Sequence, residues 1–241
     1  MSGHSKWNNI KHKKEKSDAA KAKIFTKIGK EMSVAIKAGG PDPTVNAKLR
    51  DLIAKAKANN VPNENIQRTI KKFSENNDIN YEEISYEGYG PSGVAIIVEA
   101  STDNRNRTAG NVRAWFNKYG GNLGQNGCVA YLFEEKGVIT IMDEDEEIDE
   151  DKIMEDALEC GAEDIKCDEG EYSIYTAPDE LDAVRDAIIA CGYKIETADL
   201  AKVPSTYVTL ENPEDVENME KMLDKFNEDD DVTAVFTNWD N

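Results

Sequence analysis

Apolar residues recur at three- and four-residue steps through the first third of the chain. Between Asp18 and Ala38 this spacing predicts an amphipathic helix, which the pair Gly39-Gly40 would end. It predicts a second helix from near Pro43 to Ala58, and a third that begins at Pro62-Asn63. The inward residues of the second would be Val45, Leu49, Leu52, Ile53 and Ala56, and those of the third Ile66, Ile70 and Phe73. Three helices with short loops indicate a small bundle.

After Tyr81 the pattern changes to that of strands alternating with helices. A strand is predicted around Val94 to Val98, a helix over 104–119 and a strand over 128–133. The next stretch predicts strands over 138–142, 165–167, 172–176 and 193–197, with helices over 148–160 and 178–191. Both helices end in Cys-Gly, at residues 160–161 and 191–192. This order is the β-α-β-β-α-β of a split β-α-β fold.

Beyond Pro204 one more β-α-β is predicted, with strands over 207–210 and 232–236 and a helix over 213–226. It has no partner nearby, so we expect it to pair with residues 94–133. The fold class is therefore α+β: an N-terminal three-helix bundle followed by two ferredoxin-like (split β-α-β) domains, one inserted in the other. The predicted domains are 1–78, a discontinuous 79–136 plus 204–241, and an inserted 137–203. Two sequential α+β domains with an independent C-terminal tail are the alternative.

Charge divides the chain into two unlike parts. Residues 1–73 hold 17 Lys and Arg against 6 Asp and Glu, a net of +11, whereas residues 74–241 hold 12 against 42, a net of −30. Such asymmetry is typical of a nucleic-acid-directed segment attached to an acidic body, although basic helices also bind acidic proteins or membranes. We place nucleic acid first.

The most distinctive local segment is GHSKWNNIKHKK at residues 3–14. Its cations alternate with aromatic side chains that stack on bases, a combination that suits RNA well. A solvated tail is the alternative, but Trp7 has no use in one. The candidate contacts in the arm are His4, Lys6, Trp7, Asn8, Lys11, His12, Lys13 and Lys14.

Further basic residues extend the candidate surface. Lys21, Lys23, Lys27 and Lys30 follow along the first helix. Arg105, Arg107 and Arg113 surround the predicted helix start at Asn104, where backbone N–H groups favour phosphate; pairing with local carboxylates is the alternative for these arginines. The second and third helices also allow a helix-turn-helix interpretation, with Asn65, Gln67 and Arg68 reaching bases.

Several classes of function find no support in the sequence. No catalytic triad or paired carboxylate stands out, and both His residues lie in the arm, so we expect no enzyme. We also expect no metal, no cofactor and no small-molecule substrate. The four cysteines form no C-x-x-C pair and are expected to be reduced and mostly buried. The longest aliphatic run is too short for a bilayer and no secretory segment is recognisable, so we expect a cytoplasmic protein with no membrane partner.

Long motifs in a fixed order resemble the YebC family of probable transcriptional regulators, which includes the mitochondrial translational activator of cytochrome oxidase. They are GHSKWNNIKHKK, IFTKIGKE, GGPDPTVNAKLR, KAKANNVPNENIQRTIKK, YEGYGPSGVA, TDNRNRTAGNVR and GGNLG. The resemblance spans essentially the whole chain. It implies a helical N-terminal domain and two α+β domains, one interrupting the other.

The resemblance also implies a non-enzymatic regulator of gene expression that binds nucleic acid. One described role is DNA-binding transcriptional regulation. The other is a ribosome- or RNA-associated translation factor that assists elongation through stalling sequences such as proline runs. A protein–protein adaptor is a third class, and the sequence leaves the oligomeric state undetermined.

Overall fold

The computed structural model describes residues 18–75, 80–143, 148–168 and 170–240, with the side chains of residues 18–21 and 58 left out. The arm candidates His4 to Lys14 lie outside the described residues. Contacts divide the chain into two compact units. Among described residues, the N-terminal unit holds 18–75, 80–130 and 210–237, and the central unit holds 131–143, 148–168, 170–209 and 238–240. The domain boundaries predicted above remain a proposal.

The three predicted helices are confirmed as α2 (Asp18–Gly39), α3 (Ala47–Ala58) and α4 (Asn63–Glu75). Their apolar stripes meet in one core, because residues three or four positions apart share a helix face. Met32 and Leu49 are fully buried there, and Ile28 and Ile66 nearly so. Each such burial stabilises the bundle by roughly 2 kcal/mol.

The start of α3 differs from the prediction. The side chain of Asp42 accepts hydrogen bonds from the backbone N–H and the hydroxyl of Thr44, so a turn occupies the positions after Pro43. Asn46 then caps the helix by accepting from the N–H of Leu49. The expectation that Val45 faces inward was wrong: it is 78% exposed, because it precedes the cap.

The N-terminal unit also contains a four-stranded antiparallel sheet of order β3-β1-β2-β9. Its strands are β1 (Glu82–Tyr89), β2 (Ala95–Thr102), β3 (Asn122–Leu123) and β9 (Val232–Thr237). A short 3-10 turn, η1 (Pro91–Gly93), joins β1 to β2. The expected pairing of the C-terminal segment with residues 94–133 is confirmed, since β9 pairs with β2.

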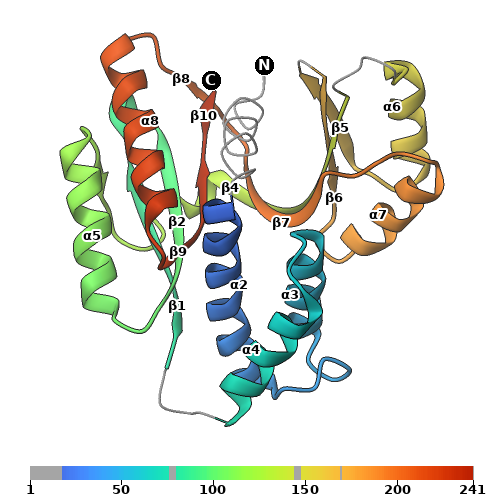
Figure 1. Cartoon of the computed structure of the whole chain (residues 1–241). Helices are drawn as coiled ribbons and strands as arrows, with labels where there is room; N and C mark the ends of the chain where they lie inside the picture. The colour runs from blue at the N-terminus through green and yellow to red at the C-terminus, as the bar shows by residue number, and fades with distance from the viewer. Residues whose placement is uncertain (1–17, 76–79, 144–147, 169, 241) are drawn as a thin grey trace. The chain divides into compact units, whose positions relative to one another are not determined.

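Helices cover both faces of this sheet. The helices α5 (Arg105–Lys118) and α8 (Pro213–Glu228) lie on one face, and α2 contacts β1, β2 and β9 (Figure 1). This explains the aliphatic run in β2, where consecutive residues Ala95 to Val98 are all buried.

The strand predicted over residues 128–133 was wrong. Cys128 lies in a turn and Ala130–Leu132 form a 3-10 turn, η2, while β3 supplies the edge strand. The cause is the carboxylate of Glu87, which accepts hydrogen bonds from the N–H groups of Gly127, Val129 and Ala130 at 2.7–2.9 Å. With these donors satisfied by a side chain, the segment needs no strand partner.

The central unit has the predicted order β-α-β-β-α-β. Its elements are β4 (Phe133–Met142), α6 (Glu150–Glu159), β5 (Asp164–Asp168), β6 (Glu171–Thr176), α7 (Leu181–Ala190) and β7 (Thr197–Pro204). The sheet order β5-β6-β4-β7, all antiparallel, is the ferredoxin-like arrangement. The last strand was predicted over 193–197 but begins at Thr197, because residues 191–192 form the turn after α7 and residues 193–196 an irregular connection. Two short parallel strands, β8 (Val208–Thr209) and β10 (Trp239–Asp240), complete the unit.

The expectation of mostly buried cysteines was also wrong. Cys167 and Cys191 are exposed, Cys128 and Cys160 are half-buried, and all four are free thiols. Within the described residues, no helix is long and apolar enough to cross a membrane.

Candidate nucleic-acid interface

Three of the predicted contact residues on α2 bind the C-terminal end of α8. The Nζ atoms of Lys23 and Lys27 donate to the carbonyl oxygens of Glu228 and Asn227 at 3.2 and 3.0 Å. Lys30 donates to the carbonyl of Asp230 at 2.8 Å. The last carbonyls of a helix have no partner within it and carry partial negative charge, so cations are stabilised there. These lysines therefore fasten α2 to the sheet domain of the N-terminal unit.

Asp231, just after this helix end, receives both Lys30 and Arg107. Its Oδ1 accepts from Lys30 Nζ at 2.6 Å and its Oδ2 from Arg107 Nη2 at 2.5 Å. The hydroxyls of Thr108 and Thr102 also donate to Oδ2, at 2.9 and 3.2 Å. Burial alone raises the pKa of Asp231, but hydrogen bonds from Arg107, Lys30 and Thr108 outweigh it and lower the pKa to about 2. The carboxylate stays ionised throughout the neutral range.

The arginines around the start of α5 divide into two kinds. Arg107 also pairs with Asp103 at 2.8 Å, so the carboxylate-pairing alternative holds for this residue. Hydrogen bonds to Asp231 and Asp103 raise its pKa further above the ordinary value. Arg105 and Arg113 are exposed. The Oδ1 of Asn104 caps the helix by accepting from the N–H of Arg107.

Helix α4 presents basic side chains to solvent. Arg68, Lys71 and Lys72 are exposed and share a helix face, because they lie three and four positions apart. Lys71 lies 3.9 Å from Glu75, and Lys72 lies over the ring of Phe73. The turn between α3 and α4 contains Asn60 at φ 57°, a left-handed conformation that helix-turn-helix loops often give to glycine. Lys21 is in α2, but its side chain is outside the described residues.

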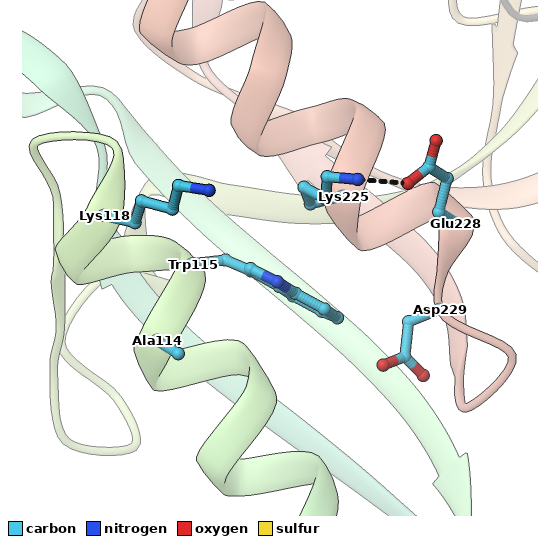
Figure 2. A pocket seen from close by; sticks show the side chains of 6 residues that line it. All are labelled: Ala114, Trp115, Lys118, Lys225, Glu228 and Asp229. Atoms are coloured by element: carbon cyan, nitrogen blue, oxygen red, sulfur yellow. Dashed lines mark hydrogen bonds and ion pairs between the residues drawn. The ribbon is translucent and has the colours of Figure 1, made fainter.

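A groove of about 530 Å³ lies between α5 and α8, with Ala114, Trp115 and Lys118 on one side and Lys225, Glu228 and Asp229 on the other. Figure 2 shows the Trp115 ring projecting from α5 toward α8, with the side chains of Lys118 and Lys225 near it. Trp115 is half-buried and packs edge-on against Phe226 at 5.7 Å between ring centroids. Lys225 pairs with Glu228 at 2.6 Å. The lining combines one aromatic ring with two lysines and two carboxylates, so the groove offers a surface on which a neutral planar ring could stack.

Sequence reasoning missed this groove. Trp115 and Lys118 belong to α5 and Lys225 to α8, which are far apart in the chain, and the helical spacing marks Trp115 only as a core position. Trp115 directly precedes the buried Phe116, so the local sequence gives no sign that its ring reaches the surface.

Models of known protein families match nearly the whole chain. Residues 5–76 match the TACO1/YebC N-terminal domain, and residues 81–239 match the TACO1/YebC second and third domains. The chain belongs to the TACO1/YebC family. This confirms the resemblance drawn from the sequence.

Curated relatives in the family carry a regulatory name. Proteins of Acetivibrio thermocellus and Agathobacter rectalis, each called a probable transcriptional regulatory protein, are 54% identical to this chain. The first match covers 99% of both chains and the second 100% of both. These names describe a regulator rather than an enzyme.

A solved structure agrees with the fold. The crystal structure of the conserved hypothetical protein Aq1575 from Aquifex aeolicus is 43% identical to this chain and has a TM-score of 0.82. The match covers 92% of this chain and 91% of that one. The α+β fold class, with a helical N-terminal region followed by sheet and helix domains, is thereby confirmed.

Proposed function

We propose that this family member regulates gene expression by binding nucleic acid, as a DNA-binding transcriptional regulator. The contact surface combines residues 1–17, the exposed basic face of α4 and the groove beside Trp115. The observation that carries the proposal is the α4 face, where Arg68, Lys71 and Lys72 are exposed within the basic first third of the chain. Clustered cations of this kind neutralise phosphates and release their counterions.

The lysines of α2 have a different part in this proposal. Lys23, Lys27 and Lys30 bond to the end of α8, so they position the surface rather than contact phosphate. The ammonium groups of these lysines are bound within the protein. They therefore contribute less to phosphate binding than the sequence predicted. The arm residues His4, Lys6, Trp7, Asn8, Lys11, His12, Lys13 and Lys14 keep their predicted role as direct contacts, as do Arg105 and Arg113.

One hydrogen bond links α2, the helix that follows the arm, to the edge of the groove. Lys23 donates to Glu228, and Glu228 lines the groove. The start of α2 at Asp18 is five residues from Lys23, about 8 Å along the helix axis. We infer that residues 1–17, which precede α2, act together with the ring of Trp115, on which an unpaired base would stack.

A ribosome- or RNA-associated translation role is the second candidate. It is favoured by the net charge of −30 over residues 74–241, which opposes approach to a long duplex, and by an aromatic groove that suits unpaired bases. Both roles use the same surface in a cytoplasmic protein, so they differ in the partner and not in the contact residues.

The test is equilibrium binding of the full chain to mixed-sequence duplex DNA, to single-stranded RNA and to purified ribosomes, at two salt concentrations. The variants are a deletion of residues 1–17, the double charge reversal Arg68→Glu with Lys72→Glu, and Trp115→Leu. Lys152→Glu is the control, because Lys152 is an exposed helical lysine on α6 of the central unit and belongs to none of the proposed contact elements. Each lost phosphate contact should lower the slope of log K against log salt by roughly 1.

Transcriptional regulation would be supported if the full chain binds DNA tightly and in a salt-dependent way. The arm deletion and the α4 reversal should each weaken that binding at least tenfold. Ribosome binding with the same sensitivity, and weak DNA binding, would assign the translation role. Binding that is unchanged in every variant, or unchanged by salt, would refute the proposed surface and favour a protein–protein adaptor.

A further inference from the structure

The two Cys-Gly sequences that end α6 and α7 bring their thiols together. Cys160 and Cys191 are the C-cap residues of these helices in the central unit, and their Sγ atoms lie 3.7 Å apart. Thirty residues lie between Cys160 and Cys191 in the chain. The contact is therefore a product of the fold and not of a local motif.

Both helix ends are fixed by backbone hydrogen bonds, so the thiols are held in place. At α6 the N–H groups of Gly161 and Ala162 donate to the carbonyls of Leu158 and Ala157. At α7 the N–H groups of Gly192 and Tyr193 donate to those of Ile189 and Ile188. Gly161 and Gly192 have φ of 99° and 98°, the left-handed conformation that this helix ending requires.

We propose that Cys160 and Cys191 form a dithiol modification site, at which a small disulfide compound oxidises the pair to an intramolecular disulfide. A Sγ separation of 3.7 Å needs only a small side-chain rotation to reach bonding distance, which is about 2.05 Å. Neither the family models nor the names of the relatives assign chemistry to these residues. The site is independent of nucleic-acid binding.

The reaction is two thiol–disulfide exchanges. The thiolate of Cys191, the exposed member, attacks one sulfur of the small disulfide; that S–S bond breaks, and one small thiol leaves with the mixed disulfide still on Cys191. The Cys160 sulfur then attacks Cys191 and releases the second small thiol. The protein loses two electrons and two protons, and the oxidant gains them as two thiols.

Cys160 suits the second step better than the first. It is half-buried, and burial, with the hydrogen bond to Cys191 and the charges of Asp156 and Glu159, raises the pKa of its thiol to about 11. Those carboxylates also favour an oxidant without negative charge. Cystamine, a dication, should therefore react several-fold faster at low salt than oxidised glutathione, which is anionic.

The experiment treats the full chain with cystamine and maps thiols by mass spectrometry without reduction. Trypsin separates the two residues into peptides 153–166 and 186–194, so a cross-link joins two distinct fragments. We expect these fragments as one species that is about 2 Da lighter than their sum, restored by dithiothreitol. In matched variants, Cys160→Ser should stop at a stable adduct on Cys191, and Cys191→Ser should slow modification of Cys160 at least tenfold.

The wild-type chain is the decisive sample, because its result cannot be caused by a substitution that disturbs folding. Recovery of both peptides as separate cystamine adducts, or as free thiols after Cys167 has been fully modified, would overturn the proposal. Equal adduct rates in the two serine variants would overturn the assigned order of attack.

Discussion

Lys30 on α2 and Asp231 before β9 form an ion pair of 2.6 Å although they are 201 positions apart in the chain. The side chains of Lys30 and Asp231 are only 11% and 6% exposed. Because the pair joins the helical segment to the sheet that the C-terminal strand completes, it couples the two ends of the N-terminal unit. The ammonium group of Lys30, which the sequence predicted to contact nucleic acid, is thus bound inside the N-terminal unit.

Removing the charge of Lys30 should destabilise this unit. Lys30→Met removes one of the two cations that pair with the buried carboxylate of Asp231. Because a buried charge with too few partners is costly, we expect the free energy of unfolding to fall by about 3 kcal/mol. Hydrogen exchange of the β2 amides would measure this within the N-terminal unit, as roughly 100-fold faster exchange. The control is Lys221→Met, whose exposed pair with Glu217 should be worth at most about 0.5 kcal/mol. Similar exchange in the two variants would contradict the role of Lys30.

Asp231 also makes the N-terminal unit sensitive to acid. Since its pKa is lowered to about 2 in the folded state, its contribution is complete above the ordinary pKa near 4 and is lost as the pH falls through that interval. Allowing for the half-exposed Arg107, the loss should be about 1–2 kcal/mol. Stability measured between pH 5 and pH 2 would test it.

The comparison for this pH series is Asp231→Asn. This variant should be less stable than wild type at neutral pH and should lose less stability on acidification. Parallel pH profiles for the two proteins would show that the acid sensitivity arises elsewhere.

Glu87 should hold the turn that replaces the predicted strand. Glu87→Ala would leave the N–H groups of Gly127, Val129 and Ala130 without their acceptor, at a cost of about 3 kcal/mol. The amides of these three residues should then exchange at least tenfold faster. Glu83→Ala, on the same strand but exposed and paired with Lys48, should leave them unchanged. Unaltered exchange in Glu87→Ala would mean that other contacts hold the turn.

Substitution of two glycines of the N-terminal unit by alanine should change the free energy of unfolding in opposite directions. A Cβ at Gly88 would lie 2.6 Å from the carbonyl oxygen of Asn122 and 2.9 Å from the Phe116 ring, so Gly88→Ala should destabilise by about 2 kcal/mol. A Cβ at Gly110, within α5, meets nothing within 4 Å, and Gly110→Ala should stabilise by about 0.5–1 kcal/mol. Thermal unfolding of both variants would test the pair. A loss of stability in Gly110→Ala would show that α5 is packed more tightly there than the structure indicates.

The elements that the sequence predicted well are those with their own periodicity and stop signals. Helix α2, for example, combines an apolar stripe with Gly39-Gly40, and the central unit alternates strands and helices in a regular order. The predictions failed where a long-range contact replaces a local preference, as at residues 128–133, which depend on Glu87 about 40 residues earlier.

By itself, the sequence determined the α+β class, the three helices, the pairing of the C-terminal strand with the earlier sheet, the family and the division of charge. The helices follow from periodicity, the charge division from composition and the family from motif order. The distant strand pairing was inferred because the C-terminal β-α-β has no partner nearby. Only the tertiary structure decided which cations remain available, because Lys23, Lys27, Lys30 and Arg107 find their acceptors in distant residues. It also brought Trp115 beside Lys225, and Cys160 beside Cys191, since packing sets the distance between residues on different helices.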